Sequence, residues 1–382
     1  METNKKNIPE IRFPEFMNDG EWLSAPLYEL IKTITPTNKL QTSEYKPSGK
    51  YPIIDQSQNY IVAYSDSAEA LTNTGCSDTI VFGDHTCALK FVNFPFIQGA
   101  DGIKIFKSKD NNKILTDYLY QYLSAFPIES KEYKRHFSEL KETLIKFPSD
   151  AIEQKRIAEC MESLERYTIQ TKVKLEQLKA HKKGLMQKLF PAPGKSVPEC
   201  RFKEFENAGE WLSSSLNEII ETVTPARKLQ VSEYKSYGKY PIIDQSQKYI
   251  VAYSDTIDAL TNMECFDAIV FGDHTCALKF VNFPFIQGAD GIKIFSSNDS
   301  NKVSTNYLYQ YLSAFPIESK EYKRHFSALK EIVIKFPSDV IEQQKIADCL
   351  SSIDNVINLY SNKLDILERH KQALRQRLFP TI

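Results

Sequence analysis

Residues 80–106 read IVFGDHTCALKFVNFPFIQGADGIKIF, and the same letters return without change at 269–295. Outward from this stretch the agreement continues with a constant offset of 189 residues, and 51–106 matches 240–295 at 48 of 56 positions. A period this long corresponds to a whole domain with its connector, because solenoid repeats are only about 20–50 residues long. The chain is therefore expected to hold two copies of one domain, and two copies of one surface suit a target with two similar halves.

Each copy begins with a mixed globular part. Short runs rich in aromatic and β-branched residues are separated by turn-forming Gly, Asn, Asp and Ser, which is typical of strands. The expected strands of the first copy are 51–55, 60–66, 78–84, 88–94 and 102–106. Helices are expected at 116–123 and 129–136, followed by a last strand near 142–147.

A long helix follows each globular part. The first is expected to start at Pro148-Ser149-Asp150, which offers a proline and a candidate N-cap, and to run through Leu189. Seam positions at alternating spacings of four and three over more than four heptads indicate a coiled coil, the alternative being a lone amphipathic helix on a domain surface. The seam positions are Ile157, Met161, Leu164, Thr168, Thr171, Leu175, Leu178, Lys182, Leu185 and Leu189, with Ile346, Leu350, Ile353, Ile357, Tyr360, Leu364, Leu367, Lys371, Leu374 and Leu378 in the second helix.

Chain connectivity predicts that the two helices pair in opposite directions, because the first leads to the second globular part and the second ends the sequence. The expected fold is α+β, with two similar mixed α/β domains separated by a pair of long antiparallel coiled-coil helices in a pseudo-two-fold symmetric arrangement. The expected divisions are 1–148 and 192–337 for the globular domains, and 149–191 and 338–382 for the helices. Lys182 and Lys371 within the seams predict local splaying of the helices.

Composition sets the broad class. A chain of 382 residues with 42% apolar and 25% charged residues is long enough for two or three domains with cores of their own. No apolar run approaches the length of a membrane-spanning helix, and the first residues lack the apolar stretch of a signal peptide, so a cytoplasmic location is expected. The seven cysteines include no CxxC pair or zinc-ligand spacing, which predicts reduced and mostly buried thiols.

The formal net charge of −1 argues against a surface that is basic everywhere, although the 48 Lys and Arg residues can be concentrated on one face. Any affinity for nucleic acid is therefore expected to be modest, or to be completed by partner proteins.

The junctions between globular parts and helices resemble a known family. They read FPSDAIEQKRIAECMESLE at 147–165 and FPSDVIEQQKIADCLSSID at 336–354, and the helices end in LMQKLFP at 185–191 and LRQRLFP at 374–380. With Trp22-Leu23 and Trp211-Leu212, these segments resemble the conserved regions of type I restriction–modification specificity subunits. The stretch at 80–106 is similar to one class of target recognition domain in that family, and the resemblance covers essentially the whole chain.

The resemblance implies a non-catalytic subunit that carries no cofactor itself. Its two recognition domains would bind the halves of a bipartite site in double-stranded DNA, with the helices setting the separation. Two methyltransferase subunits would dock on the helices and methylate adenine with S-adenosylmethionine, and restriction subunits are further partners that would use ATP and magnesium. Consistent with this role, the sequence has no glycine-rich cofactor loop, Walker motif or adenine-methyltransferase motif.

The chain departs from the family pattern in one respect. Recognition domains within one chain normally differ while the helices are alike, whereas here the recognition domains are the more similar part. Identical readers related by a two-fold axis meet identical sequences on opposite strands. The sequence therefore predicts an interrupted inverted repeat as the target. A rival hypothesis of another class is a non-enzymatic adaptor that holds two peptide-binding domains on a helical spacer.

Two polar segments are the candidates for reading bases. The segment DQSQ at 55–58 follows an expected strand, and a glutamine can bridge adenine with two hydrogen bonds; the alternative is a solvated turn. The turn GDHT at 83–86 is the second candidate, with a satisfied structural turn as its alternative. A hydrolase site there is disfavoured, because adjacent Asp and His side chains point in different directions and no partner group is visible.

Cations in 131–136 and at Lys90 are expected to bind phosphates, although a charge run on a helix is more generally a solvated face. Together the candidate DNA-binding residues are Gln56, Ser57, Gln58, His85, Thr86, Lys90, Lys134 and Arg135, with their copies Gln245, Ser246, Gln247, His274, Thr275, Lys279, Lys323 and Arg324.

Overall fold

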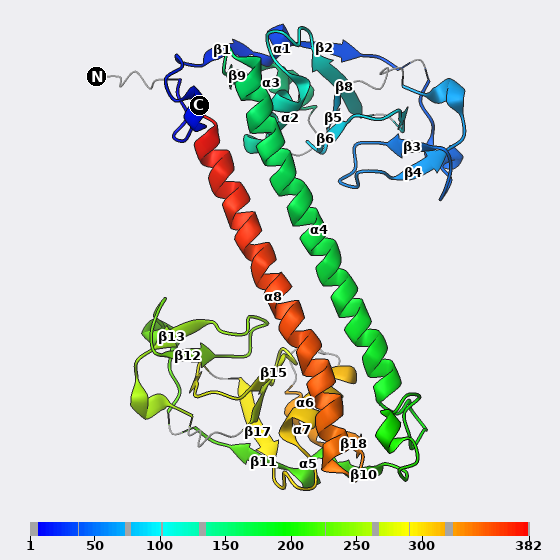
Figure 1. Ribbon diagram of the computed structural model, residues 1–382, viewed down its shortest axis with the longest axis vertical. Helices are drawn as coiled ribbons and strands as arrows, with labels where there is room; N and C mark the ends of the chain where they lie inside the picture. Colours follow the sequence, from blue (N-terminus) through cyan, green and yellow to red (C-terminus); the bar gives the residue numbers. More distant parts are fainter. Residues whose placement is uncertain are drawn as a thin grey trace. The chain divides into compact units, whose positions relative to one another are not determined.

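The computed structural model describes residues 7–36, 38–72, 78–100, 102–129, 135–225, 227–261, 267–289, 291–317 and 324–380. The chain forms two compact units (Figure 1). Unit 1 comprises Met1–Thr171 with Lys363–Ile382, and unit 2 comprises Lys172–Asn362. Each unit therefore combines one globular domain with a segment of both long helices, a division that cuts across the linear order of the chain.

The globular domain of unit 1 is built from three small sheets. Four strands pair antiparallel in the order β2-β8-β5-β6; β3 pairs antiparallel with β4 and parallel with β7; and β1 pairs with β9. The strands are β1 Leu23–Pro26, β2 Ile31–Ile34, β3 Tyr51–Ile54, β4 Ala63–Ser65, β5 Thr79–Gly83, β6 Leu89–Val92, β7 Ile97–Gln98, β8 Ile103–Ser108 and β9 Leu144–Phe147. The helices are α1 Leu27–Leu30, α2 Thr116–Ala125, α3 Phe137–Glu142 and α4 Ala151–Leu189.

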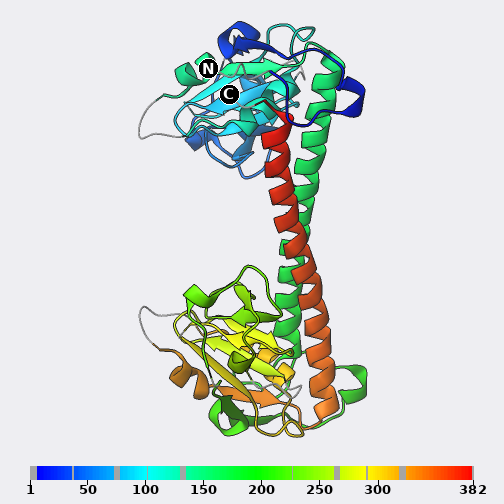
Figure 2. The same cartoon turned by 90° about the vertical axis from the view of Figure 1, so that its left-hand side faces the viewer.

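Unit 2 repeats this topology with the same strand orders and pairing directions. Its strands are β10 Leu212–Ser215, β11 Ile220–Val223, β12 Tyr240–Ile243, β13 Ala252–Ser254, β14 Ala268–Gly272, β15 Leu278–Val281, β16 Ile286–Gln287, β17 Ile292–Ser297 and β18 Val333–Phe336. Its helices are α5 Leu216–Ile219, α6 Thr305–Ala314, α7 Phe326–Lys330 and α8 Val340–Leu378. Figure 2 shows, for each unit taken by itself, that the helix segments pack along one side of the globular domain.

The strands expected from sequence are confirmed with shorter bounds, except that the strand expected at 102–106 is found as β8 and runs on to Ser108; the helix at 116–123 is confirmed as α2. The expected helix at 129–136 is wrong where it can be assessed. Residues 130–134 lie outside the described part, whereas Arg135 and His136 precede a helix that begins at Phe137. The reason is Asp84, whose carboxylate accepts the Phe137 amide and so fixes the helix start by a contact distant in sequence.

The residues at the C-terminal ends of the long helices pack into the aromatic cores of the domains. In unit 1, Phe379 makes edge-to-face contacts with Tyr118 and Tyr122 of α2. The Tyr118 hydroxyl donates to the Lys146 carbonyl over 2.7 Å, which satisfies its only polar group inside the core. Phe190 occupies the corresponding place in unit 2. The LFP sequence at both helix ends is therefore a packing element.

The Glu-Gln pair at the start of each long helix fastens that helix to the domain before it. In unit 1, the Arg12 guanidinium donates to both carboxylate oxygens of Glu153 over 2.6 and 2.7 Å, and the two side chains are 7% and 0% exposed. Gln154 donates to the carbonyls of Lys113 and Pro148 and accepts the amide of Leu115. The Asp150 carboxylate accepts the second amide of the helix, as expected of an N-cap. These contacts fix the direction of the helix relative to its domain.

Within each unit the two helix segments run antiparallel. In unit 1, Lys371 of α8 pairs with Glu165 of α4, and the Lys363 ammonium lies 4.4 Å from the centre of the Tyr167 ring. Residue numbers therefore rise along α4 while those of the contacting residues fall along α8. The seam residues Ile157 and Met161 are buried. The expected α+β class, with two similar mixed domains and paired antiparallel helices, is confirmed.

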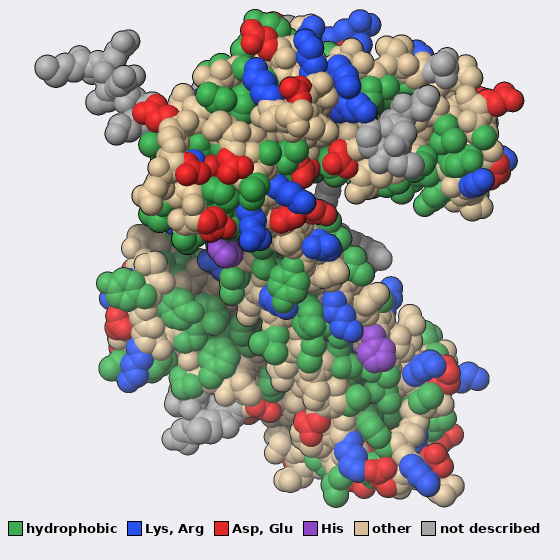
Figure 3. All heavy atoms as spheres, turned by 45° about the horizontal axis from the view of Figure 1, so that its top comes forward, with side chains coloured by type: hydrophobic (Ala, Val, Ile, Leu, Met, Phe, Trp, Pro, Cys, Tyr) green, Lys and Arg blue, Asp and Glu red, His purple; other side chains and the backbone are tan. Residues whose placement is uncertain are grey.

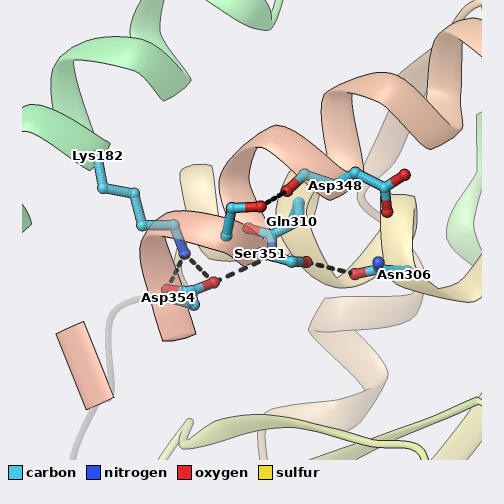
Figure 4. Close-up of polar contacts among 7 residues, drawn as sticks. Lys182, Asn306, Gln310, Asp348, Ser351 and Asp354 are labelled. Atoms are coloured by element: carbon cyan, nitrogen blue, oxygen red, sulfur yellow. Dashed lines mark hydrogen bonds and ion pairs between the residues drawn. The ribbon is translucent and has the colours of Figure 1, made fainter. Parts of the chain in front are cut away.

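The splaying expected at the seam lysines is wrong. Lys182 donates to both oxygens of Asp354 over 2.7 Å, and its side chain is only 11% exposed (Figure 4). Gln310 of α6 also donates to Asp354 and to Ser351, which in turn donates to Asn306. A long lysine can lay its stem on the apolar seam while its ammonium crosses to a carboxylate, so the helices stay paired.

Unit 1 has a more acidic version of this network, because Asp117 and Glu162 stand where unit 2 has Asn306 and Ser351. Burial raises the pKa of Asp117, and the carboxylates of Asp78 and Glu162 add to that rise, against two backbone hydrogen bonds, from the amides of Tyr118 and of Asp117 itself, that lower it. The folded pKa thus lies above the unfolded one. Stability is therefore lost as the pH rises from about 3.9, the ordinary aspartate value, through the raised value.

We expect Asp117→Asn to stabilise unit 1 at pH 7, where Asp117 is ionised in the unfolded chain, and to give no gain below about pH 3, where both states are protonated. Denaturant titrations at the two pH values measure the difference. The matched variant Asn306→Asp should destabilise unit 2 at pH 7. An equal effect of Asp117→Asn at both pH values would contradict the assignment.

Candidate nucleic-acid interface

A polar cleft of about 900 Å³ opens in the globular domain of unit 1. Its wall is assembled from the end of β2 and the loop after it, the turn after β3, the β5–β6 turn, the start of β8 and the start of α3. The lining residues are Thr33, Ile34, Thr35, Pro36, Lys39, Gln56, Asp84, His85, Gln98, Gly102, Ile103, Lys104, Ile105, Arg135, Phe137, Ser138 and Lys141.

Gln56 lies in this cleft because two glycines leave room for it. A Cβ on Gly102 would approach the Gln56 amide group to 2.6–2.7 Å, and a Cβ on Gly83 would meet Gln56 Cβ at 3.1 Å. Gly102 also has φ +99°, a conformation that side chains disfavour. Within the described residues, Gln56 Oε1 is buried and has no hydrogen-bond partner. An acceptor that no internal donor occupies, next to an amide donor, is the pair of groups that bridges adenine once the side chain turns toward the cleft.

Asp84, which lines the cleft, is held by three hydrogen bonds to the backbone of other segments. The Asp84 amide donates to the Gly102 carbonyl over 2.7 Å, its carbonyl accepts the His136 amide, and its carboxylate accepts the Phe137 amide. The turn that follows ends at Cys87, whose φ of 54° lies in the left-handed region, and the Cys87 amide donates to the Gly83 carbonyl. Asp84 is therefore a satisfied structural group, while His85 at the tip of the same turn is exposed and lines the cleft.

Two of the expected contact residues have internal roles instead. The Thr86 hydroxyl donates to the Gln56 carbonyl and so positions the backbone that carries Gln56. Lys90 is 4% exposed and donates to the carbonyls of Asp55 and Asn59 over 2.8 and 2.6 Å. Burial lowers the pKa of Lys90, which the nearby Asp55 partly offsets. Both side chains thus stabilise the 55–59 turn from beneath, in place of the outward contacts expected from sequence.

The remaining candidates are divided between the cleft and its surroundings. Arg135 lines the cleft and is exposed. Ser57 is half-buried and Gln58 exposed, and neither is among the lining residues. Lys134 and its copy Lys323 lie outside the described residues.

The lining carries more cations than sequence reasoning found. Lys39, Lys104 and Lys141 join Arg135 in the cleft, against the single carboxylate of Asp84, which is already hydrogen-bonded. This excess of positive charge suits a polyanion, and the polar edges of Gln56 and His85 among the cations suit base recognition. The one sequence signal for Lys104 was its position between the apolar Ile103 and Ile105, whose side chains point to the opposite face of β8.

Unit 2 repeats the arrangement. Of the 17 lining positions, 16 carry the same residue 189 positions later, the exception being Ile34, which becomes Val223. Lys279 is buried and donates to the carbonyls of Asp244 and Lys248, both over 2.7 Å, and Thr275 donates to the Gln245 carbonyl. The copies fall in the same places: Gln247 and His274 are exposed, Ser246 is half-buried and Arg324 is exposed.

The described part of the chain also bears on metal binding, disulfides and membrane insertion. It contains no group of three or more His, Cys, Asp or Glu residues placed to hold a metal. Five of the seven cysteines are described and none of these is in a disulfide, but Cys200 is exposed and the other four are half-buried, so the expectation of mostly buried thiols is wrong. No described helix is long and apolar enough to cross a membrane.

Comparisons with known proteins bear on the family of the chain. Residues 20–180 and 208–369 match the family model described as type I restriction modification DNA specificity domain. The type I restriction enzyme EcoR124I/EcoR124II specificity subunit of Escherichia coli is 29% identical over 214 residues, 53% of this chain and 52% of the relative. The match thus spans about half the length of that curated relative.

Among solved structures, the type I restriction-modification system S subunit from M. genitalium has a TM-score of 0.76 at 16% identity, and the alignment covers 98% of this chain and 100% of that one. This likeness supports the fold. The two matched segments of the family model together span most of the sequence, one in each repeat. The chain therefore belongs to the family of type I restriction–modification DNA specificity proteins.

Proposed function

We propose that this chain is the DNA sequence-specificity subunit of a type I restriction–modification enzyme, with one half of a bipartite site bound in the cleft of each globular domain. The observation that carries the proposal is the cleft itself, in which Gln56 and His85 stand among four cations. Gln56 and His85 would contact base edges, and Lys39, Lys104, Arg135 and Lys141 would contact phosphates. The rival adaptor role has no comparable support.

The target is expected to be an interrupted inverted repeat with near-identical halves. Support comes from the cleft lining, which differs between the copies only at Ile34 and Val223. None of the eight differences between 51–106 and 240–295 falls on a lining position. Two clefts with the same reading side chains should prefer the same bases.

Selection of bound duplexes from a random-sequence pool, followed by methylome sequencing of the source cell with and without the gene, tests both statements. The expected outcome is one inverted motif in both experiments, with binding that weakens steeply as salt rises. Two unrelated half-sites would contradict identical clefts. The absence of salt-dependent duplex binding, even with a methyltransferase partner present, would favour the adaptor.

Partner docking is proposed for the outer faces of the long helices. Large apolar side chains there are exposed, including Ile169 at 54%, Val173 at 51%, Leu359 at 68% and Ile366 at 59%. Exposed apolar residues on a helix surface mark sites for further helices. We propose that two methyltransferase subunits dock on these faces and that restriction subunits join them.

The cofactors and location follow from the same proposal. S-adenosylmethionine, ATP and magnesium would be bound by the partner subunits, because this chain is proposed to be non-catalytic, and the whole complex would work in the cytoplasm. The paired helices would set the separation of the two half-sites.

A further inference from the structure

A second hollow, of about 510 Å³, lies farther along the β2–β8 strand pair of unit 1. Its lining includes Lys32 of β2, Lys107 of β8 and Lys109 just beyond it, together with Asp78 and Asp110. Figure 3 shows Lys and Arg side chains gathered on the face of unit 1 that carries these strands. None of the three lysines lines the base-reading cleft.

The lysines are placed where their charges repel. Lys32 and Lys107 are direct partners in the antiparallel register of β2 and β8, an arrangement that destabilises a sheet when both charges have the same sign. Lys32 and Lys109 are exposed, and within the described part of the chain neither forms an ion pair. An anion bound over the hollow would offset the repulsion between Lys32 and Lys107.

Unit 2 lacks this cluster although its backbone is the same there. Glu221, Ser296 and Asn298 replace the three lysines, while the two aspartates persist as Asp267 and Asp299. Three lysines and two aspartates give the hollow of unit 1 a formal charge of +1. One glutamate and two aspartates give the same place in unit 2 a charge of −3. The base-reading cleft kept 16 of its 17 residues, so this change of sign is local.

We propose that Lys32, Lys107 and Lys109 bind DNA phosphates beyond the base-reading cleft of unit 1, and that unit 2 makes no such contacts. The proposal rests on the proposed function. Lys107 stands two residues from the cleft residue Ile105, a separation of roughly 7 Å along a strand. That is about two nucleotides along a DNA strand at roughly 3.4 Å each. Unit 1 would thus contact more phosphates than unit 2 on a DNA site with two like halves. The footprint on the side of unit 1 would be longer and more sensitive to salt.

The proposal is tested by exchanging residues between the two units, so that each substituted position takes the residue that the other unit carries there. The triple variant K32E/K107S/K109N gives unit 1 the residues of unit 2, and E221K/S296K/N298K does the reverse. The probe is a duplex carrying the selected motif, and the readouts are the slope of log affinity against log salt and the footprint at each half-site. Each phosphate contact contributes about 0.9 to the slope. The first variant should flatten the slope by up to about 2.7 and shorten the footprint on one side; the second should steepen the slope and lengthen the other side.

A control with the same charge change, K172E/K174S/K183N, alters exposed lysines of α4 and should leave the slope within about one contact of the wild type. An unchanged slope in K32E/K107S/K109N, with specific binding by the wild type intact, would overturn the proposal and leave the proposed function standing. An equal change in the control, or an altered motif in the triple variant, would also overturn it. If the wild type shows no specific binding, the proposed function itself fails.

Discussion

Replacing Glu153 by Ala is expected to lower the free energy of unfolding of unit 1 by about 3–5 kcal/mol, because it leaves a buried guanidinium without its counter-charge. The Glu153 side chain is fully buried and accepts two charge-assisted hydrogen bonds from Arg12. Arg12 is held in place independently, since it also donates to the carbonyls of Asp19 and Gly20. The cation therefore stays where water cannot easily replace the lost carboxylate.

The chain contains two tryptophans, and each reports on one unit. Trp22 is 3% exposed in the core of unit 1, and Trp211 is 6% exposed in that of unit 2. In denaturant titrations, a Trp211→Phe background isolates unit 1 and a Trp22→Phe background isolates unit 2. Glu342→Ala should cause the corresponding loss in unit 2, because Arg201 and Glu342 repeat the pair at 2.6 and 2.7 Å.

Glu159→Ala is the matched control, since Glu159 forms an exposed pair with Lys155 at 3.9 Å. Such a pair contributes less than about 1 kcal/mol. A loss in Glu153→Ala no larger than that of the control would show that the buried pair does not hold the helix to the domain.

Replacing Gln56 or Gln245 by Ala is expected to reduce discrimination at one base pair in the corresponding half-site by about 1–3 kcal/mol, or roughly 5- to 150-fold in relative affinity. The two losses should be similar, because both glutamines pack over a left-handed glycine in the same way, at Gly102 and Gly291. The double variant should lose about 2–6 kcal/mol, since distant sites act additively. Competition binding with singly substituted duplexes measures each loss.

Gln58→Ala is the control within the same segment. Gln58 is exposed and does not line the cleft, so its truncation should leave base preference unchanged. An equal loss of base discrimination in Gln58→Ala would contradict the assignment of base reading to Gln56. A Gln56→Ala variant that binds all sequences more weakly by the same factor would show that Gln56 contributes affinity without specificity.

The sequence by itself determined the features that depend on local pattern. The offset of 189 residues predicted two similar domains, the four-three spacing predicted α4 and α8, and Asp150 marked the start of α4. These succeed because backbone periodicity and capping involve residues close in the chain. The sequence also offered Gln56, His85 and Arg135 as candidates for DNA contact, and the structure brings these three into one cleft.

Only the tertiary structure decided which polar residues face outward together. Lys90 reads as an exposed cation, yet the fold buries it beneath a turn whose carbonyls are 31 and 35 residues away. No local pattern brings Lys39, Lys104 and Lys141 together, and they share a cleft because β2, β8 and α3 meet there.

The same limit explains the wrong expectations about the helices. Lys182 weakens the seam when read along one helix, but a carboxylate 172 residues away neutralises it across the pair. Asp84 moves the start of α3 to Phe137 through a hydrogen bond that spans 53 residues. Charge pairing and capping of this kind depend on distance in space, and a local pattern carries no information about which distant group will arrive.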